Sequence, residues 1–263
     1  ICDPDRRSSP TAVVKAGAAQ KEVVVAARAS AHSESQLTAA NQGAAKGKGG
    51  KGGKGGKGSK GGAAWGEGLP RSVKVSKTLT QILRHKAVDL GVDIRPDGYC
   101  RLDKMLAVSW LREIDCTLKD VQEVVHSSDK QRFELTEEDG VTFIRAVQGH
   151  SMKVVEDEQL LRRLQASDEN LPADCVHGTY QKNFESICKL GLLAGGSQGQ
   201  GFRNHVHFAP FAPGDKRVIS GMRYDSEVAI WVNLRKALED GVPFYMSQNQ
   251  VILSPGIDGL IDK

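Results

Sequence analysis

The chain has 263 residues, 26% of them charged, and a formal net charge of +4, a length that suits one or two domains. The charge is unevenly spread: residues 1–70 hold 11 Lys and Arg against 5 Asp and Glu, whereas the rest holds 25 against 27. This balance excludes a general polyanion binder beyond residue 70, so phosphate binding there must rely on a few placed cations. No apolar run approaches the ~18 residues of a membrane-spanning helix. The five cysteines lack a CxxC or zinc-type spacing, which indicates reduced thiols in an intracellular protein.

The first 71 residues are predicted to lack a fold. Residues 1–42 are rich in Ala, Ser, Val and Thr and read as a disordered leader, either a plain one or the remnant of an organelle transit peptide. Residues 43–71 contain the tract "GAAKGKGGKGGKGGKGSKGGA". Glycine offers no side chain to bury, so we expect a linker. Its lysines could add a weak, salt-sensitive attraction to nucleic acid.

Residues 72–151 are predicted to form a winged-helix-like lobe. "SKTLTQILRHKAVDLGV" has helical spacing of Leu and Ile, with Ser76 as its cap and Gly91 as its end. A turn at Pro96-Asp97-Gly98 precedes a second helix, and "LKDVQEVVHSSD" predicts a third. "RFELTEEDGVTFIRAV" then predicts two strands around a Glu-Asp-Gly turn.

Residues 152–173 form a charged connector, and residues 174–263 are predicted to form a second lobe. This lobe is predicted to contain the helices "KNFESICKLGL" and "LRKALEDG" and the strands "HVHFA", "EVAIWVN", "PFYMS" and "QVILS". The irregular order predicts an α+β fold. No GxGxxG or GxxxxGK[ST] motif is present, so the sequence does not support a Rossmann or P-loop nucleotide site.

Two polar clusters lie in the first lobe. Arg84 and His85 adjoin one another on a helix, where they could grip an anion and move a proton, or simply form a solvated helix edge. In "FIRAVQGHS" (143–151), Arg145 shares a strand face with Phe143, and Gln148, Gly149, His150 and Ser151 follow on what reads as an exposed turn. These donors could form an oxyanion pocket, or an ordinary strand exit.

Two more clusters lie in the second lobe. In "RNHVHFA", Arg203, His205 and His207 are predicted to share one strand face. A metal site at the two histidines lacks a carboxylate or third ligand, so we expect no metal. In "HGT" (177–179), Gly178 would allow close backbone approach, although a strand end with Thr179 as helix cap explains the same residues.

Taken in order, "LRH", "IRAVQGHS", "HGT", "RNHVHFA", "VISGMR" and "SQNQVILSPG" resemble the tRNA 2′-phosphotransferase family over residues 72–260. The resemblance implies an N-terminal winged-helix lobe and a C-terminal lobe of the ADP-ribosyltransferase fold, with the active site between them. It also implies that an RNA 2′-phosphate at a tRNA splice junction attacks NAD+ and expels nicotinamide. The ribose 2″-hydroxyl then attacks the phosphorus, giving 2′-OH RNA and ADP-ribose 1″,2″-cyclic phosphate.

The resemblance also assigns roles to residues. Catalysis is implied for Arg84, His85, Arg145 and Arg203. NAD+ binding is implied for His177, Gly178, Thr179, Asn204, His205, His207 and Gly221. Binding of the substrate phosphate or RNA is implied for Gln148, His150 and Ser151. Near Gln250-Val251, where many protein-modifying relatives of this fold carry a Glu, no carboxylate is present, which suits an acceptor that is already anionic.

Two other functions stay open. An ADP-ribosyltransferase acting on nucleic-acid terminal phosphates or on protein would need the same NAD+ grip but could spare Arg84 and His85. A non-catalytic RNA-binding protein would be expected to lose the four cationic residues, and all four are present. We expect RNA as partner, no membrane association and a monomer. We also expect a nuclear or cytoplasmic location, although the leader permits an organelle.

Overall fold

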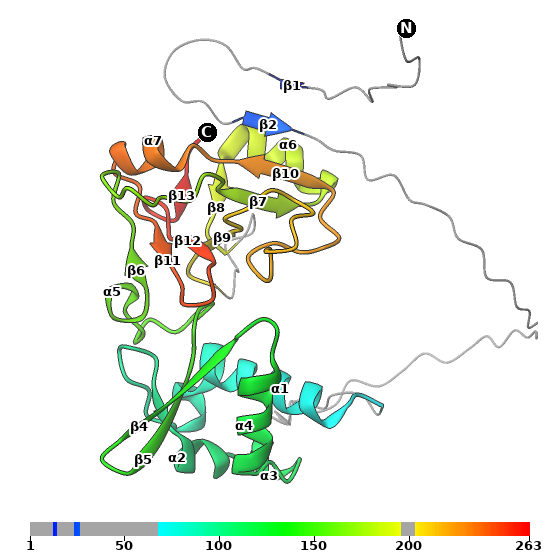
Figure 1. Cartoon of the computed structure of the whole chain (residues 1–263), viewed down its shortest axis with the longest axis vertical. Helices are drawn as coiled ribbons and strands as arrows, with labels where there is room; N and C mark the ends of the chain where they lie inside the picture. The colour runs from blue at the N-terminus through cyan, green and yellow to red at the C-terminus, as the bar shows by residue number, and fades with distance from the viewer. Residues whose placement is uncertain (1–12, 15–23, 27–67, 196–202) are drawn as a thin grey trace, which may run out of the picture.

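The computed structural model describes residues 13–14, 24–26, 68–195 and 203–263. Most of the predicted leader and linker lies outside these residues. Figure 1 shows an N-terminal lobe, drawn cyan to green, below a C-terminal lobe, drawn yellow-green to red. The first lobe holds one hydrophobic core, with buried residues between Val75 and Val155, and the second holds another, between Leu164 and Ile261. The α+β prediction is confirmed.

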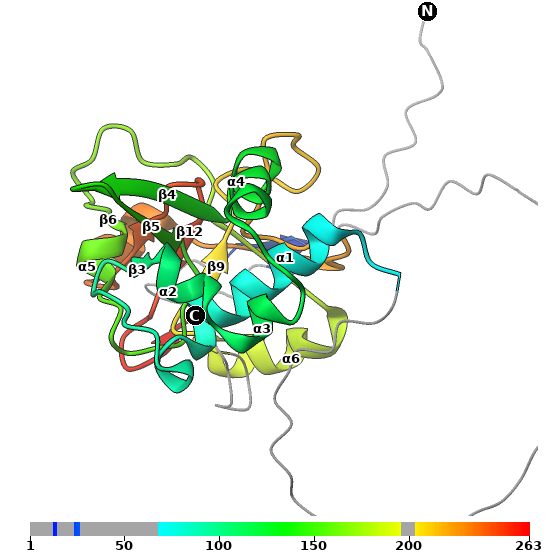
Figure 2. The ribbon, with the colours of Figure 1, turned by 90° about the horizontal axis from the view of Figure 1, so that it is seen from below.

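The N-terminal lobe combines four α-helices with a three-stranded antiparallel sheet in the order β3-β5-β4. Its elements are α1 (Arg71–Gln81), β3 (Cys100–Arg101), α2 (Leu102–Leu106), α3 (Ser109–Arg112), α4 (Leu118–Ser127), β4 (Phe133–Glu138) and β5 (Val141–Ala146). The helix α1 contacts both α3 and α4, as the view from below shows (Figure 2). In the predicted hairpin, Ile144 and Ala146 are buried while Phe143 and Arg145 keep partial exposure, as an alternating strand requires.

The first helix begins and continues differently from the prediction. It starts at Arg71 after Pro70, because proline has a fixed φ and needs no amide partner at a helix start; Ser76 therefore lies inside the helix. The chain then runs into a π-helical turn, Ile82–Lys86, and a 3-10 turn, Val88–Leu90. Gly91 ends it with φ 70°, as predicted.

The C-terminal lobe consists of short strands that pair antiparallel in every described sheet. Its elements are β7 (Val176–Thr179), α6 (Gln181–Leu190), β8 (Leu192–Leu193), β9 (Val206–Phe208), β10 (Val228–Trp231), α7 (Leu234–Glu239), β11 (Tyr245–Met246), β12 (Ile252–Ser254) and β13 (Leu260–Ile261). One sheet runs β1-β2-β10-β7 and another runs β6-β11-β12-β9. A bridge between Val176 and Ala209 joins β7 to the end of β9.

Two short strands come from the segment predicted to be a disordered leader. The strand β2 (Val24–Ala26) pairs with β10, and β1 (Val13–Val14) pairs with β2. Their valines favour extended backbone, and β10 offers an edge with free backbone groups. These five residues of the predicted leader are thus paired as strands next to β10.

The connector fixes the two lobes to one another. It contains α5 (Asp157–Leu160) and β6 (Arg162–Arg163), and Leu161 joins a small apolar cluster with Tyr245, Val251 and Leu253. The turn between β11 and β12 also reaches the first lobe, because Asn249 Nδ2 donates to the Lys130 carbonyl at 2.8 Å. A polar contact thus joins the lobes directly, and Leu160 of the connector joins them by apolar packing, because it contacts both the N-terminal core and this cluster.

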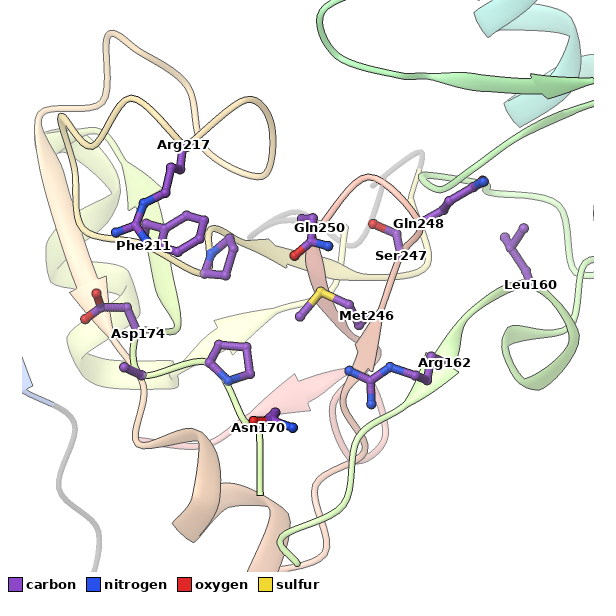
Figure 3. A pocket seen from close by; sticks show the side chains of 13 residues that line it. Leu160, Arg162, Asn170, Asp174, Phe211, Arg217, Met246, Ser247, Gln248 and Gln250 are labelled. Carbon is purple, nitrogen blue, oxygen red and sulfur yellow. The ribbon is translucent and has the colours of Figure 1, made fainter. Parts of the chain in front are cut away.

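A cavity of about 680 Å³ opens on the flank of the C-terminal lobe. Figure 3 shows Phe211 with Arg217 on one side and Met246 with Arg162 on another. The Arg217 guanidinium lies 4.0 Å from the Phe211 ring centroid and pairs with Asp215. Along the described residues, no helix is both long and apolar enough to cross a membrane.

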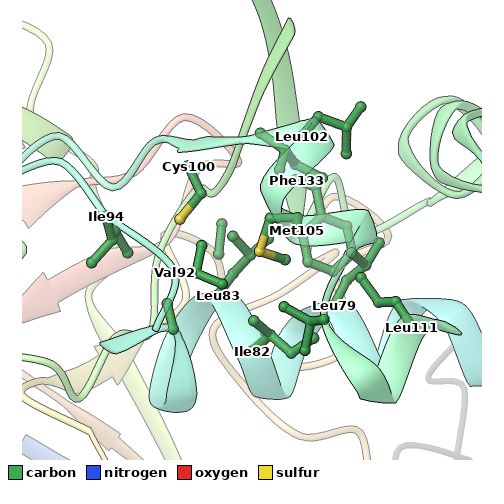
Figure 4. Close-up of a cluster of buried hydrophobic side chains, with 14 of the residues drawn as sticks. Leu79, Ile82, Leu83, Val92, Ile94, Cys100, Leu102, Met105, Leu111 and Phe133 are labelled. Carbon is green, nitrogen blue, oxygen red and sulfur yellow. The ribbon is translucent and has the colours of Figure 1, made fainter. Parts of the chain in front are cut away.

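The core of the N-terminal lobe gathers under α1. Figure 4 shows Leu79, Ile82 and Leu83 of this helix and the turn after it facing Met105 and Leu111. All five side chains are fully shielded from solvent. This packing sets the position of the next turn of the chain, which carries Arg84.

Replacing Leu79 by Ala should lower the free energy of unfolding by about 2–5 kcal/mol, because it leaves a cavity in this core. Urea unfolding followed by circular dichroism measures the change. Val88→Ala is the matched control, since Val88 is 57% exposed and should shift stability by no more than about 0.5 kcal/mol. Equal effects of the two substitutions would contradict the position of α1 in the core.

Candidate active site

Arg84 lies in the π-helical turn and is buried, with 6% exposure. Its Nε has no hydrogen-bond partner, and no described carboxylate forms an ion pair with it. Gly149 crosses over its guanidinium: a Cβ at Gly149 (φ +86°) would lie 3.1 Å from Arg84 Nη1. Burial, and then the charges of Arg203 and Arg132, lower the pKa of Arg84 to about 9. Arg84 is thus a cation without a counterion, beneath the "QGHS" backbone.

His85 follows Arg84 and reaches Ser151. Its Nδ1 lies 2.9 Å from Ser151 Oγ, and that hydroxyl is positioned to donate to the Arg84 carbonyl at 3.4 Å. With the hydroxyl proton so used, Nδ1 carries the imidazole proton and Nε2 is left as an acceptor. Burial first, and then the charges of Arg84 and Arg203, lower the pKa of His85 to about 4. His85 is therefore neutral at pH 7.

Arg203 lies near Arg84 and His85, and these three residues together with His150 form the Arg84 cluster. Arg203 is exposed, yet nearby protein still lowers its pKa by desolvation, with a further contribution from Arg223. The next residue ties this segment to the first lobe, because the Asn204 amide donates to the His150 carbonyl at 3.1 Å. The two arginines thus differ in exposure: Arg84 is buried, whereas Arg203 is accessible to solvent.

The segment "QGHS" is not the exposed turn that the sequence suggested. Gln148 and His150 are 5% and 3% exposed, because the C-terminal lobe covers them. Neither ring nitrogen of His150 has a hydrogen-bond partner among the described residues. Burial and the charge of Arg84 lower the pKa of His150 to about 3. A buried imidazole with two unpaired nitrogens is uncommon in proteins and marks this place as unusual.

His207 and Gln148 join the two lobes. His207 Nδ1 lies 3.1 Å from the His205 carbonyl, so it must donate there, and Nε2 lies 2.9 Å from the Gln148 side-chain amide. Burial holds the pKa of His207 well below its usual value, so Nε2 is unprotonated. The atom placed at Nε2 is Gln148 Oε1, but two acceptors cannot share a hydrogen bond, so the amide is turned by a half-rotation and Nε2 accepts from its NH2.

Arg145 does not join the Arg84 cluster in its described contacts. Its Nε and Nη2 both bind Glu134 Oε2 at 2.7 Å, and Nη1 donates to the Asp97 carbonyl at 3.1 Å. Its guanidinium also stacks 4.5 Å from the Tyr99 ring centroid. It lies near enough to His150 to make a small contribution to lowering that pKa, after burial and the charge of Arg84.

The "HGT" segment is strand throughout. Thr179 belongs to β7, and Tyr180 rather than Thr179 caps α6. His177 Nδ1 donates to the His207 carbonyl at 3.0 Å, which leaves Nε2 as an acceptor.

Gly178 and Gly221, both implied by the resemblance for NAD+ binding, are packed against protein on the side where a Cβ would lie. A Cβ on Gly178 would lie 2.2 Å from Met222 Cγ, and one on Gly221 (φ +91°) would lie 2.5 Å from the Phe208 carbonyl oxygen. Both residues must therefore be small for the 221–226 segment to lie against β7 and β9.

His205 is buried, and its Nε2 contacts Asp157 Oδ2 at 2.8 Å. It thus anchors the connector helix α5 to the second lobe. Among the described residues no group of three or more His, Cys, Asp or Glu could hold a metal ion.

The structure brings most of the predicted residues together where the lobes meet, and adds others. The flank cavity shares no lining residue with this cluster. Sequence reasoning missed Arg132 and Arg223, which lie near Arg84 and Arg203 respectively, and Glu134, the partner of Arg145. Glu134 could have been found, because hairpin register places it opposite Arg145.

The sequence matches known proteins over most of the described lobes. A sequence model described as "RNA 2′-phosphotransferase, Tpt1 / KptA family" matches residues 70–256. The chain is 40% identical to tRNA 2′-phosphotransferase 1 of Danio rerio, over 71% of this chain and 79% of that one. It is 44% identical to the Bos taurus protein of that name (73% and 72%) and 37% identical to tRNA 2′-phosphotransferase of Saccharomyces cerevisiae (71% and 80%). The chain belongs to the RNA 2′-phosphotransferase family.

Proposed function

We propose that this chain is an NAD+-dependent tRNA 2′-phosphotransferase, which removes the internal 2′-phosphate of a spliced tRNA and transfers it to NAD+. The observation that carries the proposal is the Arg84 cluster, together with family membership. A buried guanidinium without a carboxylate, an exposed Arg203 beside it and an unpaired His150 form a site that lacks an anion. A phosphate is the anion that the family acts on.

The cost of burying Arg84 explains why a phosphate should bind there. Each unit of pKa depression corresponds to about 1.4 kcal/mol, so keeping Arg84 charged costs the free protein several kcal/mol. Charge-assisted hydrogen bonds from Arg84 to a phosphate dianion would offset this cost of burial. The same cations would stabilise the charge that develops on the phosphoryl group during transfer, without reorganising during the reaction.

We propose that His85 manages a proton rather than acting as a cation. Its low pKa keeps it neutral, and its Nδ1–H is committed to Ser151. Nε2 is then able to take the proton of the ribose hydroxyl that attacks the phosphorus. Arg145 is held in place by Glu134 and Tyr99. We propose that it orients the RNA phosphate.

The residues proposed for NAD+ fit a ribose-bearing ligand. His177 Nε2 is an available acceptor for a hydroxyl, and the 221–226 segment forms a wall held close by Gly178 and Gly221. When bound, NAD+ supplies the ribose carbon that receives the phosphate, and nicotinamide leaves. The N-terminal lobe is proposed to be a winged helix that binds RNA, and the C-terminal lobe an ADP-ribosyltransferase-like fold that binds NAD+.

An RNA oligonucleotide with one internal 2′-phosphate tests this function. Incubation with NAD+ and without added metal should release the phosphate as ADP-ribose cyclic phosphate, detected by mass spectrometry. Arg203→Met should lower kcat by about 10²–10³, the usual effect of losing one donor to a developing anion. Arg217→Met, on the flank cavity, is the control and should leave kcat unchanged.

Two results would contradict the proposal. If ADP-ribose stays on the RNA, the chain performs ADP-ribosylation without phosphate release. If no nicotinamide is released while RNA still binds, the protein is an RNA-binding module.

The buried His150 also predicts how stability depends on pH. The unfolded chain takes up a proton near pH 6.5, whereas folded His150 resists protonation until about pH 3. The free energy of unfolding should therefore fall as pH drops through this window, by about 1.4 kcal/mol per pH unit from this group. Urea unfolding of His150→Gln should show a slope shallower by that amount. The exposed His126→Gln is the control, and identical slopes for His150→Gln and the unmodified protein would contradict the burial of a neutral His150.

A further inference from the structure

Arg132 is a cation beside the cluster that neither the sequence motifs nor the proposed mechanism uses. It precedes β4, and its carbonyl accepts a hydrogen bond from the Val147 amide at 3.0 Å. Arg132 therefore lies opposite Val147 in the hairpin, next to Gln148. Its side chain is half-buried. Its charge is also close enough to Arg84 to lower the pKa of that residue.

The side chain of Arg132 makes few polar contacts among the described residues. Its one described hydrogen bond runs from Nη1 to Ser128 Oγ at 3.4 Å, a long contact, and no described carboxylate pairs with it. Partial burial lowers its pKa. The arginines nearby on the same lobe differ: Arg145 pairs with Glu134, Arg95 with Asp97 and Glu138, and Arg101 with Asp103. Arg132 is therefore a second cation that approaches Arg84 without a counterion.

An RNA substrate brings more than one anion to this place. The 2′-phosphate to be removed is flanked by the phosphodiesters of the RNA backbone, and such contacts position an RNA without reading its sequence. Arg84 lies buried under Gly149 and suits the 2′-phosphate, whereas Arg132 lies further out, on the hairpin side of the same segment. We propose that Arg132 binds a backbone phosphodiester next to the modified nucleotide and so positions the 2′-phosphate over Arg84. This inference rests on the proposed function.

The alternative is a structural one. Ser128 is the C-cap of α4, and a cation near a helix C-terminus stabilises the helix. In that case Arg132 would contribute to folding and not to RNA binding. The two roles differ in the salt dependence of RNA binding, because only a phosphate contact releases counterions.

The test measures RNA binding without NAD+, so that it does not depend on turnover. A fluorescent single-stranded RNA with one internal 2′-phosphate is titrated by anisotropy over a series of salt concentrations. Arg132→Gln should weaken binding about tenfold, the loss of one charge-assisted contact, and lower the salt slope by about 0.7. Arg101→Gln removes an exposed, paired arginine of the same lobe and should change neither.

A second ligand separates the backbone phosphate from the 2′-phosphate. A nucleoside 2′-phosphate lacks the neighbouring phosphodiester, so it should bind Arg132→Gln and the unmodified protein equally. An unchanged salt slope, combined with a lower free energy of unfolding for Arg132→Gln, would assign Arg132 to the α4 terminus and overturn the proposal. Weaker binding of the nucleoside 2′-phosphate would overturn it too. If the unmodified protein binds the RNA but releases no phosphate with NAD+, the proposed function fails while the binding result still decides the role of Arg132.

Discussion

The buried charge of Arg84 is the constraint on which the rest of the site depends. Its guanidinium can lie there only because the chain turns through a π-helical segment and because Gly149, with no side chain, crosses over it. Burial, and then the charge of Arg84, lowers the pKa of both His85 and His150, so these neighbours are neutral. π-Helical turns are often found at functional sites, and this one presents Arg84 and His85 together.

The second requirement is that the two lobes stay docked. The contacts of His207 with Gln148 and of Asn204 with the His150 carbonyl both cross the lobe boundary. The turn between β11 and β12 adds Asn249 and Gln248, which contact Lys130 and Glu134. Glu134 also holds Arg145, so one carboxylate links an interlobe contact to a proposed catalytic residue. Catalytic groups supported from two sides in this way are held more rigidly than groups on a free loop.

The sequence predicted what depends on local periodicity. The alternation of "FIRAV" places Ile144 and Ala146 in the core and Arg145 on the opposite, partly exposed face, and Gly91 ends the first helix, as the structure has them. The burial of Gln148 and His150 could not be predicted, because it depends on contacts with the C-terminal lobe, such as that of Gln148 with His207, 59 positions away in the chain. The close packing at Gly178 and Gly221 is likewise set by residues distant in the chain, because a Cβ on Gly178 would meet Met222 and one on Gly221 would meet Phe208. Arg132 lacked a recognisable motif, and only its proximity to Arg84 singles it out.

The most direct test of the account is the stability of Arg84→Met with and without inorganic phosphate. Methionine keeps most of the side-chain volume and removes an unpaired buried charge, a change that usually stabilises a protein. Thermal unfolding should therefore show a higher Tm for the variant in phosphate-free buffer, and phosphate should raise the Tm of the unmodified protein alone. If Arg84→Met lowers the Tm and phosphate still stabilises it, Arg84 is not the buried phosphate-binding cation on which this account rests.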